Sequence, residues 1–322
     1  MEWKDLEETM SVTHLIRMQL EAFKSKTNTA VTIGVLDGVH LGHQALLKCL
    51  CNEAQVKGLE PGVITLHPHP ITVLKPEITA RYLTSLEERI TLLKEHGAKW
   101  VAPLTFTSEL AEMTAEELAE ELYKTLGMRL LVLGPDAAFG RGAPQDTVDR
   151  METLGKKIGF ETITIKPFLV SDERCSSTRI RKALDEGLME EVKILLGRYY
   201  RLAGPVVHGY ERGRTLGYPT ANISVAANRS LPALGVYATR AFLQGDKTTY
   251  YGATNIGKRP TFDEGHLSIE THLLDYDGNL YDKRMEIELI TRIRGEKTFE
   301  DLNMLRTQIA EDVARIRDIT ND

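Results

Sequence analysis

The sequence predicts an α/β chain of two domains, in which a parallel sheet flanked by helices is followed by an antiparallel β-barrel. In the first half, short apolar runs alternate with helical patterns, whereas the second half is rich in short strands separated by glycine and proline. The chain also has 322 residues, which is more than one hydrophobic core ordinarily holds, since single cores stop growing near roughly 250–300 residues.

Five apolar runs in the N-terminal half are expected to be the strands of the parallel sheet. Helical patterns separate them, as in βαβ units with helices on both faces. The runs are short and continuous rather than alternating, which is typical of strands buried on both sides. The expected strands are Val31–Leu36, Val63–Leu66, Trp100–Leu104, Leu130–Leu133 and Thr162–Ile165, and the expected helices are Gln44–Lys57, Leu86–His96, Ala115–Leu126 and Thr147–Ile158.

The pattern changes after two short helices, which are expected over Ser177–Asp185 and Met189–Leu195. Runs rich in Val, Tyr, Thr and Ile follow at the spacing of an antiparallel barrel or sandwich. These runs are Tyr200–Gly209, Gly235–Leu243, Thr248–Asn255, Leu267–Leu274 and Arg284–Arg292.

The last segment, Phe299–Ile316, is expected to be a helix with one apolar stripe. Because the change of pattern begins after Gly187, the domain boundary is placed near that residue. The expected domains are therefore 1–187 and 188–322.

The charge balance and the lack of long apolar runs disfavour several classes of protein. The net charge is −6 and the pI is near 5.9, so bulk electrostatics do not favour a nucleic-acid or membrane partner. No apolar run approaches the roughly 20 residues that span a bilayer, and the acidic N-terminal segment does not resemble a signal peptide. The cysteines lack metal-ligand spacing and fit reduced thiols. We therefore expect a cytoplasmic protein; its oligomeric state has no indication in the sequence.

A glycine-bearing turn leads from the first expected strand into the first helix and carries two histidines. Gly38 and Gly42 allow close backbone approach, and the helix N-terminus presents unpaired N–H groups that suit polyphosphate. His40 and His43 are three residues apart, so both lie on one side of the opening turn and can donate hydrogen bonds to phosphate. The spacing alone leaves open an ordinary strand-to-helix turn; a zinc site would need a third ligand at a helical interval.

A second glycine-dense, polar segment lies between the first two expected strands of the C-terminal half. Glycines allow the backbone to wrap a phosphate chain, and Thr220 and Asn222 offer oxygen ligands suited to Mg²⁺. Composition alone leaves open a surface loop between strands.

The order of these motifs resembles the prokaryotic bifunctional riboflavin kinase/FAD synthetase family. The string G-x-x-D-G-V-H-x-G-H, at Gly34–His43, is similar to the nucleotidyltransferase turn of that family, and G-R-T-L-G-Y-P-T-A-N, at Gly213–Asn222, is similar to its riboflavin kinase signature. The other matching segments, in the family's order, are Pro68-His69-Pro70, Gly134-Pro135-Asp136, Phe139-Gly140, Ser176–Arg181, Asn255–Phe262 and Ile269–His272.

The resemblance implies an enzyme that phosphorylates riboflavin to FMN and adenylylates FMN to FAD, with ATP as co-substrate and Mg²⁺ as cofactor. It implies a Rossmann-like nucleotidyltransferase domain with a parallel sheet, followed by a riboflavin kinase β-barrel with a terminal helix. The partners that it implies are riboflavin, FMN, FAD and ATP.

The resemblance also implies roles for individual residues. Glu270 would be the general base for the ribityl 5′-hydroxyl, while Thr220 and Asn222 would bind the magnesium of Mg–ATP. Contacts to the ATP phosphates in adenylyl transfer are assigned to Gly34, Asp37, Gly38, His40, His43, Ser176, Ser177, Thr178 and Arg181, of which His40, His43 and Arg181 are catalytic. Flavin contacts in that reaction are assigned to Pro68, His69, Asp136 and Phe139. The ATP and flavin contacts of the kinase are assigned to Gly213, Arg214, Thr215, Gly217, Pro219, Asn255, Gly257, Arg259 and Pro260.

The sequence departs from the family's pattern where the flavin of the adenylyl step should lie. Leu66 and Ala137 stand where the family usually has aromatic residues, and the segment 142–146 is also altered. These departures leave open a monofunctional riboflavin kinase with a degenerate or regulatory N-terminal domain. A flavin-sensing or RNA-binding regulator on the same scaffold is disfavoured by the acidic pI.

Overall fold

The computed structural model describes residues 11–141, 147–208, 216–258, 267–281 and 283–321. The chain divides by its contacts into two compact units, Met1–Ser176 and Ser177–Asp322. None of the helices in the described ranges is both long and apolar enough to cross a membrane.

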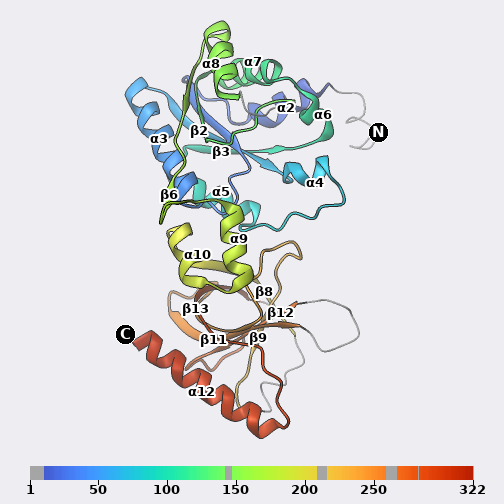
Figure 1. Ribbon diagram of the computed structural model, residues 1–322, viewed down its shortest axis with the longest axis vertical. Helices are drawn as coiled ribbons and strands as arrows, with labels where there is room; N and C mark the ends of the chain where they lie inside the picture. Colours follow the sequence, from blue (N-terminus) through green and yellow to red (C-terminus); the bar gives the residue numbers. More distant parts are fainter. Residues whose placement is uncertain (1–10, 142–146, 209–215, 259–266, 282, 322) are drawn as a thin grey trace. The chain divides into compact units, whose positions relative to one another are not determined.

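The first unit is built on a five-stranded parallel sheet with the order β3-β2-β1-β4-β5 (Figure 1). Because β1 lies between β2 and β4, the strand order reverses next to it, and ligands of open α/β sheets bind at the carboxyl ends of strands at such a point. The strands are β1 (Thr29–Gly34), β2 (Glu60–His67), β3 (Trp100–Thr105), β4 (Met128–Leu133) and β5 (Glu161–Thr164).

Helices cover both faces of this sheet, and each face has its own hydrophobic core. One core joins the sheet to α2, α6, α7 and α8, and the other joins it to α3 and α5. These helices are α2 (Val12–Glu21), α3 (Leu41–Lys57), α5 (Leu86–Glu95), α6 (Ser108–Glu112), α7 (Ala115–Leu126) and α8 (Thr147–Ile158), with the short α4 (Pro70–Leu74) after β2.

Local sequence explains where several of these helices begin and end. Ser85 and Glu88 form a capping box at the start of α5, and Thr114 and Glu117 form another at the start of α7. Gly58 ends α3 in the left-handed conformation.

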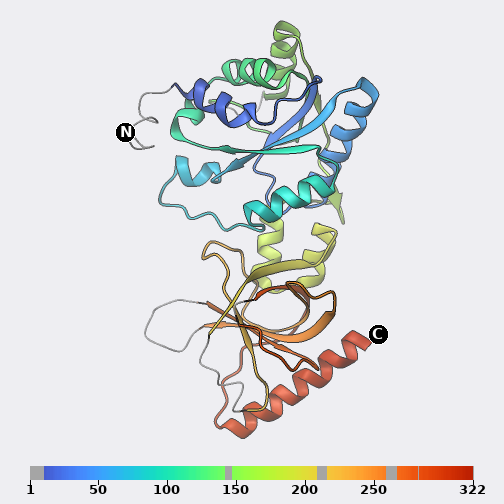
Figure 2. The ribbon, with the colours of Figure 1, turned by 180° about the vertical axis from the view of Figure 1, so that it is seen from behind.

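The second unit is a closed antiparallel barrel with the strand order β10-β11-β12-β9-β8-β13. The last helix, α12, lies on the outer side of the barrel (Figure 2), and its Ile316 and Val313 pack with residues of β10, β11 and β13. The barrel strands are β8 (Tyr200–Val207), β9 (Ala221–Ile223), β10 (Gly235–Leu243), β11 (Thr249–Lys258), β12 (Leu267–Leu273) and β13 (Arg284–Gly295), and the final helix is α12 (Leu302–Asn321).

Two further helices, α9 (Ser177–Glu186) and α10 (Met189–Leu196), belong to the second unit by contacts. The backbone N–H of Ala233 donates to the carbonyl oxygen of Leu184 at 2.8 Å, which ties α9 to the chain entering β10. The expected functional boundary near residue 187 stays a prediction. Near the end of the first unit, Leu169–Val170 and Glu173–Arg174 pair as the small ribbon β6–β7.

The predicted fold class is confirmed, and the differences lie at particular elements. β9 lies in a segment expected to be a loop, and α2, α4 and α6 were not expected from the sequence. The terminal helix begins at Leu302, whose side chain is 69% exposed rather than part of the packed stripe.

Candidate active sites

The first candidate site lies in the turn between β1 and α3, at the carboxyl edge of the sheet. Leu36, Gly38 and Val39 have positive φ angles of 53°, 84° and 40°. At Gly38 a Cβ would lie 2.8 Å from Leu83 Cδ1, so both conformation and space require glycine. Leu36 and Val39 are not glycine, so surrounding contacts must hold this turn in a strained conformation.

The two histidines stand together on the first turn of α3. His40 is the N-cap, and its Nδ1 accepts a hydrogen bond from the backbone N–H of His43 at 3.4 Å. The rings stack with their centroids 3.7 Å apart and their planes 20° apart. Gly42 makes room for this, since a Cβ there would lie 3.0 Å from His40 Cε1.

The protonation of the pair follows from its surroundings. Because Nδ1 of His40 accepts, a neutral His40 ring carries its proton on Nε2. Burial lowers the pKa of His43 well below its ordinary value of 6.5, and neighbouring His40 and the charge of Arg89 act in the same direction. Nδ1 of His43 is buried and has no hydrogen-bond partner among the described residues. His43 therefore offers an uncharged imidazole at neutral pH.

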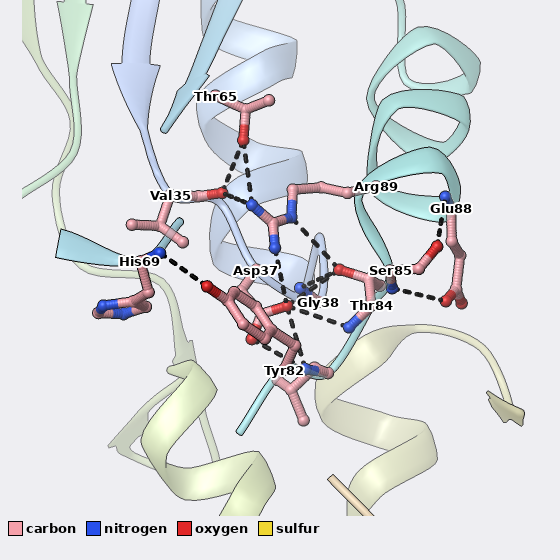
Figure 3. A network of polar contacts seen from close by, with 11 residues as sticks. Val35, Asp37, Gly38, Thr65, His69, Tyr82, Thr84, Ser85, Glu88 and Arg89 are labelled. Atoms are coloured by element: carbon pink, nitrogen blue, oxygen red, sulfur yellow. Dashed lines mark hydrogen bonds and ion pairs between the residues drawn. The ribbon is translucent and has the colours of Figure 1, made fainter. Parts of the chain in front are cut away.

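Asp37 is buried, and its carboxylate faces Thr84 at the start of α5 (Figure 3). It accepts hydrogen bonds from the backbone N–H of Leu83 at 2.9 Å and of Thr84 at 3.0 Å. The N–H of Gly38 in turn donates to the Thr84 hydroxyl at 3.2 Å. These groups fix the turn, and the phosphate contacts expected for Asp37 and Gly38 stay predictions. A carboxylate also repels phosphate, so an anchoring role suits Asp37 better. Gly34 ends β1 opposite Thr65.

The expected flavin segment follows β2, which is the neighbour of β1 in the sheet. The peptide bond before Pro68 is cis. His69 is the N-cap of α4, with its Nδ1 accepting from the N–H of Ile71 at 3.1 Å. The backbone N–H of His69 donates to the Tyr82 hydroxyl at 2.7 Å.

Asp136 and Phe139, which follow β4, have different surroundings. Asp136 is exposed and forms an ion pair with Arg174. Phe139 is 2% exposed and belongs to a hydrophobic core of the sheet, and the flavin contact expected for it stays a prediction. Leu66 and Ala137 are half-buried against the same core.

The serine-threonine segment opens α9. Ser176 precedes the helix and Ser177 begins it, Thr178 is exposed, and Arg181 is half-buried. Arg179 donates to Glu191 of α10 at 2.9 Å, which joins the two helices. Ser177, Thr178 and Arg181 fall in the second unit. The assignment of this segment to phosphate binding in adenylyl transfer stays a prediction.

In the barrel, three polar residues stand in a row across neighbouring strands. Glu270 of β12 is paired with Asn222 of β9 on one side and with Asn255 of β11 on the other. Residues directly opposite in antiparallel strands share a face, with Cβ atoms about 4.5–5.5 Å apart. The carboxylate of Glu270 therefore lies between the amides of Asn222 and Asn255 on one face of the barrel wall. Thr220 immediately precedes β9.

A cavity of about 590 Å³ opens beside Thr220 and is lined on its other sides by residues that include Leu273, Tyr276 and Tyr281. Its volume lies in the range of small-molecule pockets, about 300–1,000 Å³. The edge that carries Thr220 is held in place, since Nδ1 of His272 donates to the carbonyl oxygen of Pro219 at 2.8 Å.

Several assigned kinase residues lie outside the described residues, and their roles stay predictions. Of those described, Gly217 has a positive φ of 86°. At Gly257 a Cβ would lie 2.6 Å from Glu296 Oε1 and 3.1 Å from Asn255 Nδ2, so the glycine keeps space beside the polar row. The undescribed kinase residues are Gly213, Arg214, Thr215, Arg259 and Pro260.

The donor set around Thr220 fits the expected magnesium ion. A threonine hydroxyl, the amide oxygen of Asn222 and the carboxylate of Glu270 are hard oxygen donors of the kind that Mg²⁺ prefers. Thr220 and Asn222 are separated by one residue at the start of β9, and Glu270 is paired with Asn222.

The sequence pattern did not indicate the residues that hold the turn between β1 and α3, chiefly Arg89 and Tyr82. Arg89 is fully buried in α5. The spacing in the sequence could have indicated the burial of Arg89, because it stands three residues after Leu86 and four before Leu93, within the apolar stripe of the expected helix. Cys175 was also missed; its Sγ lies 3.7 Å from His40 Nδ1.

Comparison with known proteins gives matches along nearly the whole chain. A family model described as FAD synthetase matches residues 22–179, and one described as riboflavin kinase matches residues 196–320. The bifunctional riboflavin kinase/FMN adenylyltransferase of Escherichia coli (strain K12) is 35% identical over 289 residues, which are 89% of this chain and 91% of that protein. The protein of the same description from Bacillus subtilis (strain 168) is 32% identical over 308 residues, 94% of this chain and 95% of that protein.

A solved structure supports the same arrangement. A crystal structure of a Streptococcus pneumoniae protein, described as a macrolide-efflux protein, has a TM-score of 0.84 at 29% identity and covers 92% of this chain and 96% of that one. Together with the curated relatives, these matches confirm the resemblance seen in the motifs. The chain therefore belongs to the bifunctional riboflavin kinase/FMN adenylyltransferase family.

Proposed function

We propose that this chain converts riboflavin to FAD in two ATP-dependent steps, phosphorylating riboflavin in the barrel unit and adenylylating FMN at the parallel sheet. The observation that carries the proposal is that both family models match one chain, in the order of the two structural units. The E. coli relative, which aligns over 91% of its own length, is described by both activities.

For the adenylyl step, an FMN phosphate oxygen attacks the α-phosphorus of ATP, the bond to the bridging oxygen of the β-phosphate breaks, and pyrophosphate leaves. His40 and His43 supply N–H donors to the phosphate oxygens as negative charge moves onto the leaving group. Their stacking fixes both donors before the substrate arrives, and Arg181 would supply the positive charge. The attacking phosphate is already an anion, so no base is required.

For the kinase step, the ribityl 5′-hydroxyl attacks the γ-phosphorus of ATP, and ADP leaves. Glu270 accepts the hydroxyl proton, and its paired neighbours Asn222 and Asn255 hold that carboxylate in a polar row. Mg²⁺, held by Thr220 and Asn222, would supply charge neutralisation for the phosphates.

The cavity beside Thr220 is proposed to take the nucleotide of the kinase step. Aromatic side chains at Tyr276 and Tyr281 suit a planar base, and Thr220 lies on the wall of the same cavity. The acidic composition and three free cysteines support a cytoplasmic location.

Incubation of the pure protein with riboflavin, ATP and Mg²⁺, followed by separation of the flavins, tests the proposal. FMN should appear first and FAD afterwards, with ADP from the first step and pyrophosphate from the second. If FMN accumulates and no FAD forms even at high FMN and ATP, the protein is a monofunctional kinase. The departures at Leu66 and Ala137 are the reason to test this outcome.

A further inference from the structure

Arg89 of α5 is fully buried although its guanidinium is permanently charged. Its Nη1 donates to the carbonyl oxygen of Val35 at 2.9 Å and to the Thr65 hydroxyl at 3.3 Å. Its Nη2 is paired with Asp37 Oδ1 at 3.6 Å. A buried charge is strongly unfavourable unless its partners compensate, so the cation is tolerated here because of these contacts.

The contacts of Arg89 all reach the histidine turn, defined as residues 35–43, or its immediate support. Asp37 joins Arg89 to the segment before α5, because its carboxylate also accepts hydrogen bonds from the backbone N–H groups of Leu83 and Thr84. The hydroxyl of Thr84 closes the network by accepting from the N–H of Gly38 at 3.2 Å and donating to Asp37 at 3.0 Å. Figure 3 shows the guanidinium of Arg89 between Val35 and Thr65 on one side and Tyr82 and Thr84 on the other.

The segment Tyr82–Thr84, which supports the histidine turn, also contacts the flavin segment, defined as residues 67–70. Tyr82 directly precedes Leu83, and its hydroxyl accepts the backbone N–H of His69 at 2.7 Å. The guanidinium carbon of Arg89 lies 5.6 Å from the centroid of the Tyr82 ring, which is within the range of a cation–π contact. The rings of Tyr82 and His67 have their centroids 5.6 Å apart. One buried arginine is therefore in contact with the supports of both segments.

We propose that Arg89 is a positioning residue for adenylyl transfer, which sets the histidine turn and the flavin segment at the spacing that the in-line attack needs. The inference rests on the proposed synthesis of FAD. The turn contains Leu36 and Val39 at positive φ, a strained conformation that persists only where contacts with the surrounding structure hold it. The hydrogen bonds and the ion pair of Arg89 and Asp37 supply such contacts. Because in-line transfer depends on the positions of both substrates, a displacement of about 1 Å is expected to cost on the order of 10²-fold in rate.

The test compares wild type with Arg89→Met and Arg89→Lys, with both reactions measured on each preparation. Arg89→Met keeps a long side chain but removes the donors and the charge, so kcat for FAD formation from FMN should fall by about 10²-fold. Riboflavin phosphorylation should stay unchanged, because it uses the other unit. Arg89→Lys keeps the charge without the planar fork and should not restore kcat.

A third variant, Tyr82→Phe, removes only the acceptor of the His69 N–H. It should raise the FMN KM of the adenylyl step several-fold and leave the ATP KM unchanged, which a general loss of stability would not do. The matched control is Leu122→Ala, because Leu122 is a fully buried residue of α7 in a different hydrophobic core from Leu36 and Val39 of the histidine turn. Its effect on FAD formation, measured at a temperature where all proteins are folded, gives the consequence of destabilisation alone.

The outcomes separate the alternatives. A loss of FAD formation in Arg89→Met no larger than in Leu122→Ala overturns the inference and leaves Arg89 as a core stabiliser. Should Arg89→Met fail to fold, Tyr82→Phe decides, and an unchanged FMN KM overturns the inference. Wild-type protein that makes FMN but never FAD overturns the proposed function, and the inference with it.

Discussion

At the scale of single residues, the two reactions require different side chains because their nucleophiles differ. The FMN phosphate has no proton to lose, and the turn before α3 has no exposed carboxylate and carries His43, whose pKa is lowered by burial. The riboflavin hydroxyl must lose a proton, and the barrel places Glu270 between two amides. Asp37 is the one carboxylate of the histidine turn, and it is buried against backbone N–H groups, so it presents no proton acceptor to a substrate.

The first residue-scale prediction is a crossed pair of variants. Glu270→Gln keeps the size of the side chain but removes the proton acceptor, so riboflavin phosphorylation should fall by about 10²–10⁴-fold. FAD formation from supplied FMN should persist. His43→Ala should suppress FAD formation and spare the kinase. Both activities are assayed on both proteins, and equal damage to both by Glu270→Gln in a folded protein would assign Glu270 a structural role.

The second residue-scale prediction concerns the departures from the family pattern. Leu66→Phe together with Ala137→Phe should lower the FMN KM of the adenylyl step, because each ring contact with the flavin is worth about 0.5–1.5 kcal/mol beyond its area. Both positions are half-buried against the core, so thermal midpoints are measured alongside to detect overpacking. Unchanged kinetics in a folded double variant would place the flavin elsewhere.

At the scale of elements, α2 is attached to the sheet unit partly through a buried carboxylate. Glu121 of α7 accepts from Arg17 of α2 at 2.9 Å and from the Thr125 hydroxyl at 2.7 Å. Burial would raise the pKa of Glu121, but these hydrogen bonds outweigh it, and the pKa lies below the ordinary 4.5. A lowered carboxylate pKa contributes stability that is present above the unfolded value and is lost as the pH falls through the folded value.

Glu121→Gln should therefore lower the free energy of unfolding by about 1 kcal/mol at neutral pH. The difference from wild type should shrink as the pH falls below about 4.5, the ordinary value for this group. Glu120→Gln is the matched control, because the adjacent Glu120 is exposed and pairs only at the surface with Lys124, which contributes little. Denaturant unfolding at several pH values measures both. A difference that is constant with pH would contradict the assignment.

The elements that the sequence predicted carry a local apolar pattern, which is periodic in the helices and largely continuous in the sheet strands. Ala115–Leu126 has the predicted bounds, and its buried positions repeat at the period of a helix. Gly235–Leu243 also has the predicted bounds, and most of its residues are buried in one nearly continuous run. β9 was missed because three residues are too few to show alternation, and its place in the barrel is decided by pairing with β8 and β12. α2 was missed because only two of its residues, Ile16 and Leu20, are buried.

At the scale of the whole molecule, motif order identified the two reactions, whereas the positions of particular side chains depended on tertiary structure. The pairing of Glu270 with Asn222 joins residues far apart in the chain, and only the barrel register brings them together. The burial of Phe139 and the network around Arg89 likewise arise from packing between segments, to which local patterns are insensitive.

The division into two units predicts that the kinase works alone, and it predicts where the fragment must begin. A fragment 177–322 keeps α9, whose Leu184 carbonyl accepts from Ala233 and whose Arg179 bonds to Glu191 of α10. A fragment 188–322, which starts at the boundary expected from the sequence, loses Ile180, Ala183 and Leu184, all buried. Both should phosphorylate riboflavin with Mg–ATP, and the longer should have the higher midpoint of thermal unfolding, since it keeps this apolar surface covered. Neither should form FAD. Circular dichroism with kinase assays decides: a folded but inert 177–322 would show that the kinase needs the sheet unit, and equal midpoints would show that α9 contributes nothing to the stability of the barrel.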